Sequence, residues 1–294
     1  MKSFSAFDDL GQQRLPHRFE TVIDAHVHLF PDPIFQAIWR WFDEFAWPIR
    51  YKLTSNQIIE FLTSRGIARV LGLHYAHKPG MAHQLNTYMA ELCRNHPQLI
   101  GTATVFPGEE NAVDILKEAF ELGLAGVKLH AHVQYFAVDD AVMREIYESC
   151  ADYNKPLIMH VGREPKNPKF PYKRDPYETC KADKLERILI DYPGLKICVP
   201  HLGADEFDQY RRLLECYDNL WLDTAMVLVD YVPNFGSPKL SDLRADRVMF
   251  GTDFPNIPYA WDTEIRQLET RQLPEDFLTG ILKRNASEFL SIKM

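Results

Sequence analysis

Two histidines one residue apart mark the first part of the chain that could do chemistry. His26 and His28 stand in the stretch TVIDAHVHLF, directly after Val22 and Ile23. In a β-strand, residues two apart point to the same face. The two imidazoles would therefore lie side by side at the end of an apolar strand, where they could bind a metal ion. Two surface histidines are the alternative, and the pair alone does not decide between them.

Other histidines also follow apolar runs. Eight of the eleven histidines fall at or just beyond the C-terminal end of such a run: His26, His28, His74, His77, His130, His132, His160 and His201. Asp253 stands at the end of the last run. Chance would scatter these residues over helices and loops, so their clustering predicts one shared site. Histidine and aspartate suit a borderline divalent ion such as Zn²⁺, which lowers the pKa of a bound water to about 7. A further His or Asp could then take or deliver a proton.

The runs that carry these residues predict eight strands. They cover residues 21–28, 68–75, 99–107, 125–133, 156–162, 195–203, 219–225 and 248–255. Continuous apolar character with Val and Ile is typical of parallel strands buried on both faces. Amphipathic segments alternate with them, and several end at Gly or Asn as helices do. The connection over 226–246 is the least clearly helical, and a closing helix is expected at 274–290.

Eight strand–helix units without a composition break predict a single-domain (β/α)8 TIM barrel, an α/β fold, over residues 21–294. Residues 1–20 would form an N-terminal extension. An open doubly wound sheet is the alternative, but no Gly-rich phosphate loop follows the first run. In a barrel the active site lies at the C-terminal ends of the strands, which is where the histidines fall.

Composition narrows the function classes. The chain has 294 residues, 46% of them hydrophobic and 25% charged, with a net charge of −8. The lack of a basic stripe argues against a nucleic-acid partner, and no apolar run is long enough for a membrane span or a signal peptide. Five cysteines, odd in number and without a CxxC pair, predict reduced thiols and a cytoplasmic location: Cys93, Cys150, Cys180, Cys198 and Cys216.

A family resemblance rests on five short motifs. DAHVH, GVKLH, MH, HLG and GTDFP occur in that order on the predicted strands. Together they resemble the amidohydrolase superfamily, above all its amidohydrolase-2 branch of aminocarboxymuconate-semialdehyde decarboxylase-like and related hydrolytic enzymes. The resemblance spans residues 22–292. The tail RNASEF is similar to the closing Gly-Asn-Ala motif of that branch, but Arg284 stands where Gly is usual.

The resemblance implies roles for five residues. His26, His28, His160 and Asp253 would hold the metal. His201 would polarise the substrate or shuttle a proton, and Asp253 could also accept a proton from the activated water. Members of this branch usually have a site for one metal ion. The resemblance therefore implies one divalent ion per chain rather than two, with Zn²⁺ as the first candidate.

Three further residues have open roles near this site. Elsewhere in the superfamily a lysine placed like Lys128 is carboxylated and bridges two metals, but Lys128 could instead bind a substrate carboxylate or pair with an acid. His130 could line the pocket or be a plain loop residue. Arg163, next to His160, could clamp a carboxylate with two hydrogen bonds. The basic run that continues through Lys166, Lys169, Lys173 and Arg174 could attract an anionic substrate or be only solvated.

An aromatic-rich loop follows the first predicted strand. Residues 30–52 contain Phe30, Phe35, Trp39, Trp41, Phe42, Phe45, Trp47 and Tyr51. This segment could be an apolar lid over an unsaturated or ring-containing substrate. It could equally be a helical insertion packed on the barrel or on the second subunit of a homodimer.

These observations predict a metal-dependent enzyme acting on a small anionic molecule. The main hypothesis is hydrolysis of a carboxylated ester, lactone or amide by metal-activated water. The second is non-oxidative decarboxylation of an aromatic or muconate-type acid, since the same metal cage serves both. The third is a catalytically dead barrel used for binding, although none of the expected ligands is missing.

Overall fold

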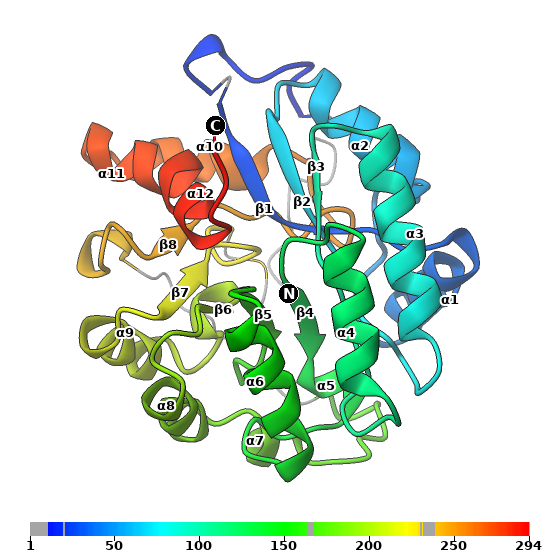
Figure 1. The fold of residues 1–294 in the computed structure, drawn as a ribbon. Coiled ribbons are helices and arrows are strands. Elements are labelled where there is room, and N and C mark those ends of the chain that lie inside the picture. Colours follow the sequence, from blue (N-terminus) through cyan, green and yellow to red (C-terminus); the bar gives the residue numbers. More distant parts are fainter. Residues whose placement is uncertain (1–10, 20, 164–166, 230, 232–238, 294) are drawn as a thin grey trace.

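Eight parallel strands form a ring at the centre of the chain (Figure 1). The computed structural model describes residues 11–19, 21–163, 167–229, 231 and 239–293. The strands are β1 (Ile23–His28), β2 (Arg69–Leu73), β3 (Leu99–Gly101), β4 (Val127–His130), β5 (Leu157–His160), β6 (Ile197–Val199), β7 (Leu220–Asp223) and β8 (Val248–Met249). Strands β1–β3 and β4–β8 pair in sequence order, and the bridges Ala103–Val127 and Val27–Phe254 join the two sets into a closed barrel. The predicted (β/α)8 fold is confirmed.

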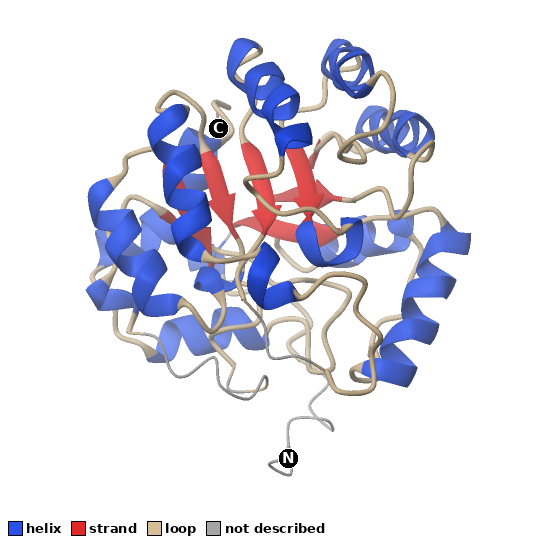
Figure 2. Cartoon of the chain, turned by 90° about the horizontal axis from the view of Figure 1, so that it is seen from below, coloured by secondary structure: helices blue, strands red, loops and turns tan. Residues whose placement is uncertain are grey.

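Helices surround this ring and connect its strands (Figure 2). They are α1 (Asp32–Phe45), α2 (Ser55–Ser64), α3 (Ala82–Asn95), α4 (Ala112–Glu121), α5 (Ala131–Gln134), α6 (Arg144–Asp152), α7 (Pro176–Thr179), α8 (Ala182–Asp191), α9 (Phe207–Cys216), α10 (Thr263–Thr270), α11 (Glu275–Thr279) and α12 (Asn285–Phe289). The start of α2 shows how the sequence sets such a boundary. Thr54 and Gln57 form a reciprocal capping box that satisfies two backbone N–H groups. In the connection between β7 and β8, the described residues contain only one 3-10 turn, Leu240–Asp242.

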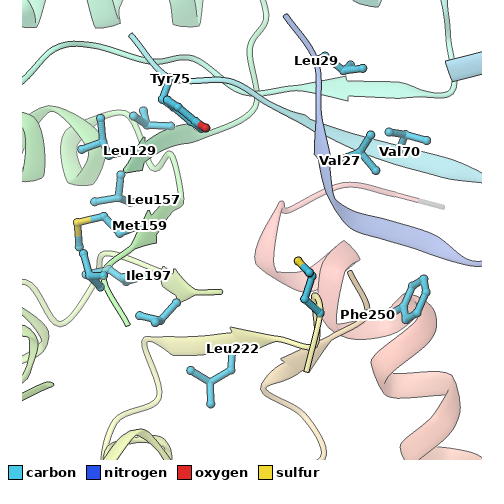
Figure 3. Close-up of a cluster of buried hydrophobic side chains, with 14 of the residues drawn as sticks. Val27, Leu29, Val70, Tyr75, Leu129, Leu157, Met159, Ile197, Leu222 and Phe250 are labelled. Atoms are coloured by element: carbon cyan, nitrogen blue, oxygen red, sulfur yellow. The ribbon is translucent and has the colours of Figure 1, made fainter. Parts of the chain in front are cut away.

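The outer faces of the strands pack against the helices. Figure 3 shows this layer, with Val27, Val70, Leu129, Leu157, Met159, Ile197 and Leu222 among the labelled side chains. A second cluster contains the opposite faces, including Leu71, Ile158 and Trp221, and α12 contributes Phe289 to it. The rings of Trp221 and Phe289 lie 5.5 Å apart. The closing helix therefore covers the end of the barrel opposite the strand C-termini.

The tail motif RNASEF holds this helix in place through Asn285. Its Nδ2 donates to the carbonyl oxygens of Ala245 and Val248. Arg284 has ordinary helical angles (φ −58°) and pairs with Asp276, so this position requires no glycine here.

An irregularity in β1 explains how one strand supplies both the core and the site. The pairing of β1 with β2 shifts register between Asp24 and Val27. Before the shift, Ile23 and Ala25 belong to the second hydrophobic cluster, inside the barrel. After the shift, Val27 belongs to the first cluster, between the strands and the helices. A bulge of this kind changes which face alternate residues occupy. It lets His26 and His28 point inward just above Ala25.

The described part of the N-terminal segment packs on the barrel. Leu15 donates its N–H to Arg65 O, and Gln12 bonds Asp262 and Trp261 near α10. Residues 1–10 of the predicted extension lie outside the described residues. No helix within the described ranges is both long and apolar enough to cross a membrane.

Candidate active site

His26, His28 and Asp253 bring three ligand atoms together at the C-terminal end of the barrel. His26 Nε2 lies 3.3 Å from His28 Nε2, and Asp253 Oδ1 lies 3.3 Å and 3.0 Å from these two atoms. All three residues are buried. The side-by-side placement predicted from the spacing of His26 and His28 is confirmed. Strand β1 and the segment after β8 thus meet at one point, as the closure of the barrel requires.

The backbone around Asp253 is held in an unusual conformation. Asp253 has a φ of 66°, and its N–H donates to His26 O at 2.9 Å. Nearby, Asp24 accepts hydrogen bonds from Thr252 Oγ1 at 2.6 Å and from the N–H groups of Thr252 and His26 at 3.1 Å. Burial raises the pKa of Asp24 to about 7 despite these donors. Asp24 therefore ties the two ligand-bearing segments together, a role that the DAHVH motif did not reveal.

Asp223, the last residue of β7, connects two histidines of the site. Its Oδ2 accepts from His26 Nδ1 at 2.8 Å. Its Oδ1 accepts from the N–H groups of His201 and Ala225, both at 3.1 Å. Sequence reasoning missed this residue, although its place at a strand C-terminus was a usable signal. A carboxylate behind a metal-binding histidine fixes the ring and its tautomer.

His201 is held by the same β7 end. Its backbone is left-handed (φ 57°), and its Nδ1 lies 2.8 Å from Ala225 O. A carbonyl only accepts, so Nδ1 carries a hydrogen, and in the unprotonated ring the lone pair is at Nε2. The ring centre lies 5.2 Å from that of His26. His201 is thus next to the three-residue cluster without being part of it.

His160 and His130 form a stacked pair beside His201. Their ring centroids lie 4.0 Å apart with an interplanar angle of 8°. His160 Nδ1 is 3.3 Å from His201 Nε2. The group of ligand atoms that lie within 4.8 Å of one another contains His26, His28 and Asp253 among the described residues, and not His160. The role of His160 as a fourth ligand stays a prediction.

Lys128 points into the barrel beneath the site. In the pairing of β4 with β5, Lys128 is next to Ile158, which belongs to the second hydrophobic cluster. The side chain of Lys128 is fully buried. Burial first, and then the charge of Lys128, lower the pKa of His26 well below its usual value. Burial likewise lowers the pKa of His28. Both imidazoles are therefore neutral near pH 7, as metal ligands must be.

Arg163 does not line the cavity above the site. Its Nε donates to Asp205 at 3.1 Å, and its guanidinium lies over the ring of Tyr177. Of the basic run that follows, Arg174 pairs with Asp140. Lys166 lies outside the described residues. The expected carboxylate clamp at Arg163 has no support in this geometry.

A cavity of about 840 Å³ opens above the cluster. Six histidines line it: His28, His77, His130, His132, His160 and His201. The aromatic-rich loop contains helix α1, whose Trp41, Phe42 and Phe45 face the same space. The segment is therefore a helix whose side chains line the cavity, while its role as a lid over a substrate and its packing on a second subunit stay predictions.

The donor set fits a divalent metal ion. His26 gives the hydrogen on Nδ1 to Asp223, so a lone pair on Nε2 points toward Asp253 Oδ1 and His28 Nε2. Although burial alone would raise it, hydrogen bonding to His28 and the charges of His28, His26 and His201 hold the pKa of Asp253 at about 2. Neutral imidazole nitrogens and an ionised carboxylate oxygen converging in a buried site are typical of Zn²⁺ and similar ions.

Solved structures with the same fold include three informative ones. An uncharacterized TIM-barrel protein from Bordetella bronchiseptica is 22% identical, with a TM-score of 0.69 over 92% of this chain and 98% of that one. A 5-carboxyvanillate decarboxylase from Novosphingobium aromaticivorans, complexed with manganese and a nitrobenzoic acid, is 17% identical, with a TM-score of 0.66 over 99% and 100%. A proposed 2-pyrone-4,6-dicarboxylic acid hydrolase from Pseudomonas putida is 18% identical, with a TM-score of 0.63 over 93% and 98%.

These identities show the shared fold and leave the reaction open between hydrolysis and decarboxylation. No curated protein sequence matches the chain. The amidohydrolase family model of the amidohydrolase-2 branch matches residues 23–292, which include every strand of the barrel. The chain therefore belongs to this amidohydrolase family.

Proposed function

We propose that the protein is a metal-dependent hydrolase of a small carboxylated ester, lactone or amide. The observation that carries this proposal is the tautomer of His201. Because Nδ1–H donates to Ala225 O, the unprotonated ring of His201 has its lone pair at Nε2, beside the cluster of His26, His28 and Asp253. Attack by water requires such a base within reach of the attacking oxygen.

The other residues of the site would bind the metal ion and position its ligands. A bound divalent ion, Zn²⁺ before others, would supply a Lewis acid and lower the pKa of nearby water to about 7. His26, His28 and Asp253 would hold this ion, with His160 as a further candidate ligand. Asp223 orients His26 and positions the backbone of His201. Asp253, with a pKa of about 2, stays ionised and can accept a hydrogen bond from water.

Decarboxylation is the second candidate, and the apolar cavity favours it. Aromatic side chains of α1 and of the segment 167–172 line the space above the cluster. Removing water from a carboxylate in such a space disfavours its charge, and loss of CO₂ relieves that cost. His201 would take up a proton from water at Nε2 and then pass it to the carbon that loses CO₂.

The experiment that separates the two reactions uses metal-loaded protein of measured metal content. A panel of lactones, esters, amides and aromatic or muconate-type acids is assayed for acid release and for CO₂ in parallel. Acid release without CO₂ supports the hydrolase. Release of CO₂ in proportion to substrate loss would replace the hydrolase with the decarboxylase.

The variant His201→Asn tests whether His201 acts as the proton acceptor. Asn can still donate to Ala225 O but offers no Nε2 lone pair, so kcat and kcat/KM should fall together by about 10²–10⁴-fold. Metal content and thermal stability should match the wild type, and His83→Asn, at an exposed position of α3, is the matched control. Loss of metal would make His201 a ligand and favour a two-metal site with Lys128. Full activity would make it a structural residue only.

A further inference from the structure

The cavity above the cluster of His26, His28 and Asp253 has an uneven distribution of charge. The described residues that line it include no lysine and no arginine. Asp253 carries the one carboxylate among them, at the bottom of the cavity. Of the basic run after β5, Arg163 pairs with Asp205 and Arg174 pairs with Asp140. Lys173 lies over the ring of Tyr135, a residue that lines the cavity. An anionic group that contacts this lining far from His26, His28 and Asp253 would meet no lysine or arginine among the described lining residues.

One part of the cavity wall is apolar and comes mainly from one face of α1. Ile34, Ile38, Trp41 and Phe45 recur at helical spacing and line the cavity. Residues three or four apart lie on one side of a helix, so this stripe forms a continuous surface. The length of that surface extends the cavity well beyond the cluster of His26, His28 and Asp253.

Phe170 meets this stripe from the loop after β5. Its ring lies 5.4 Å from Trp41 and 5.3 Å from Phe45, at angles of 78° and 76°. Asn167 donates its side-chain Nδ2–H to Phe45 O, which ties the two segments together. Trp41, Phe45 and Phe170 are called the aromatic clasp here. Edge-to-face contacts of this kind are favourable and leave flat ring faces for an inserted apolar group.

Volume and chemistry together point to a class of substrate. The cavity, at about 840 Å³, is at the upper end of the ordinary range for sites of drug-sized ligands, about 300–1,000 Å³. We propose that the substrate places its anionic group, together with any bond to be hydrolysed, at the cluster of His26, His28 and Asp253, and an extended, uncharged aryl or alkyl group against the aromatic clasp. This inference rests on the proposed metal site, and it narrows the small anionic substrate expected from the sequence to a molecule with a bulky apolar end.

The physical reason for the preference is desolvation. An apolar group transferred from water to the clasp gains binding energy in proportion to the area buried. A carboxylate transferred there loses its hydration without an ion pair to replace it. The clasp should therefore discriminate between ligands that differ only at the end far from the metal.

Three ligands and equilibrium titration calorimetry test the proposal without turnover. They are benzoate, para-phenylbenzoate, and the diacid that adds a second carboxylate at the far end of para-phenylbenzoate. On metal-loaded wild type, para-phenylbenzoate should bind about tenfold or more tightly than either of the others. Its advantage over benzoate should persist in metal-free protein, because the clasp is built from side chains of this chain. A diacid that binds as tightly as the monoacid overturns the proposal.

Two variants locate the effect in the clasp. Trp41→Ala should reduce the advantage of para-phenylbenzoate and leave benzoate affinity unchanged, while Tyr153→Ala, an exposed aromatic outside the cavity, should change neither. Ile34→Lys places a cation in the cavity wall and should shift the preference toward the diacid. Equal effects of Trp41→Ala and Tyr153→Ala would overturn the proposal. Ligand preference without any turnover would instead contradict the proposed reaction alone.

Discussion

Asp223 Oδ2 accepts the hydrogen of His26 Nδ1 at 2.8 Å. A carboxylate at the end of β7 thus fixes which nitrogen of this β1 histidine faces His28 and Asp253. Both side chains are fully buried. The same carboxyl group accepts the N–H of His201 through Oδ1. One residue therefore sets the tautomer of an expected ligand and the backbone position of the expected base.

The variant Asp223→Asn tests this coupling. To keep Oδ1 for His201 and Ala225, the new amide must point its NH₂ group at His26 Nδ1. The ring would then carry its hydrogen on Nε2, facing the cluster, and metal affinity should fall by about 10–100-fold, as for other partners behind metal ligands. Competition with a chelator measures this affinity, and Asp208→Asn on the exposed face of α9 is the control. An unchanged affinity in Asp223→Asn would contradict the tautomer argument.

A second prediction concerns the ligands themselves. His26→Ala and Asp253→Ala each remove one of three converging donor atoms and should strip the metal from the purified protein. Elemental analysis of each variant gives the metal content per chain, with His83→Ala as control. Full retention in both variants would contradict the assigned site. His160→Ala, analysed alongside, decides whether His160 is the fourth ligand or only the neighbour of His201.

The sequence predicted the strands well and their ends poorly. All eight strands lie inside the predicted runs, but several stop early, as β3 does at Gly101 and β6 at Val199. Hydrophobic periodicity continues past these ends because the next residues are also buried. Their backbones leave the extended region, with positive φ at His201, Met226 and Asp253. Such angles are set by hydrogen bonds across the barrel mouth, which a local pattern does not record.

The site was predictable where its residues are histidines at strand ends. His26, His28, His201 and Asp253 meet as expected, because barrel closure brings strand C-termini together. Asp24 and Asp223 were missed, since an aspartate in or after a strand has many ordinary explanations. The role predicted for Arg163 rested on its closeness to His160 along the chain, which said nothing of its partner Asp205.

A third prediction follows from His74, which is fully buried. Its Nε2 lies 3.3 Å from Asn86 Oδ1, and burial lowers its pKa from 6.5 to about 3. The unfolded chain binds a proton here below about pH 6.5, whereas the folded chain does not until about pH 3. Stability is therefore lost as the pH falls through this range. Between pH 7 and 5 the loss from this residue is about 2 kcal/mol.

Urea unfolding at several pH values measures this slope. His74→Gln keeps a donor toward Asn86 but does not titrate, so its stability should fall less steeply between pH 7 and 5 than that of the wild type. His83→Gln, at an exposed position of α3, should keep the wild-type slope. Parallel pH profiles of wild type and His74→Gln would show that His74 titrates normally in the folded state.

The last prediction concerns Glu264, and its sign is opposite. This residue of α10 is fully buried. It accepts the hydroxyl of Tyr259 at 2.7 Å and the N–H of Leu228 at 3.2 Å. It thereby links the segment after β8 to the segment after β7, where Met226 lines the cavity.

Burial, opposed by these two hydrogen bonds, raises the pKa of Glu264 from 4.5 to about 8. Between these values the folded chain keeps a proton that the unfolded chain releases, so stability falls as the pH rises from about 4.5 to 8. At pH 7 the cost is about 3 kcal/mol. Glu264→Gln does not titrate, and the difference in unfolding free energy between this variant and wild type should shift in its favour as the pH rises from 5 to 8. Glu121→Gln at the exposed end of α4 is the matched control, because its carboxyl is solvated in both states. A constant difference between Glu264→Gln and wild type across this range would mean that Glu264 is ionised in the fold and that a counter-charge offsets its burial.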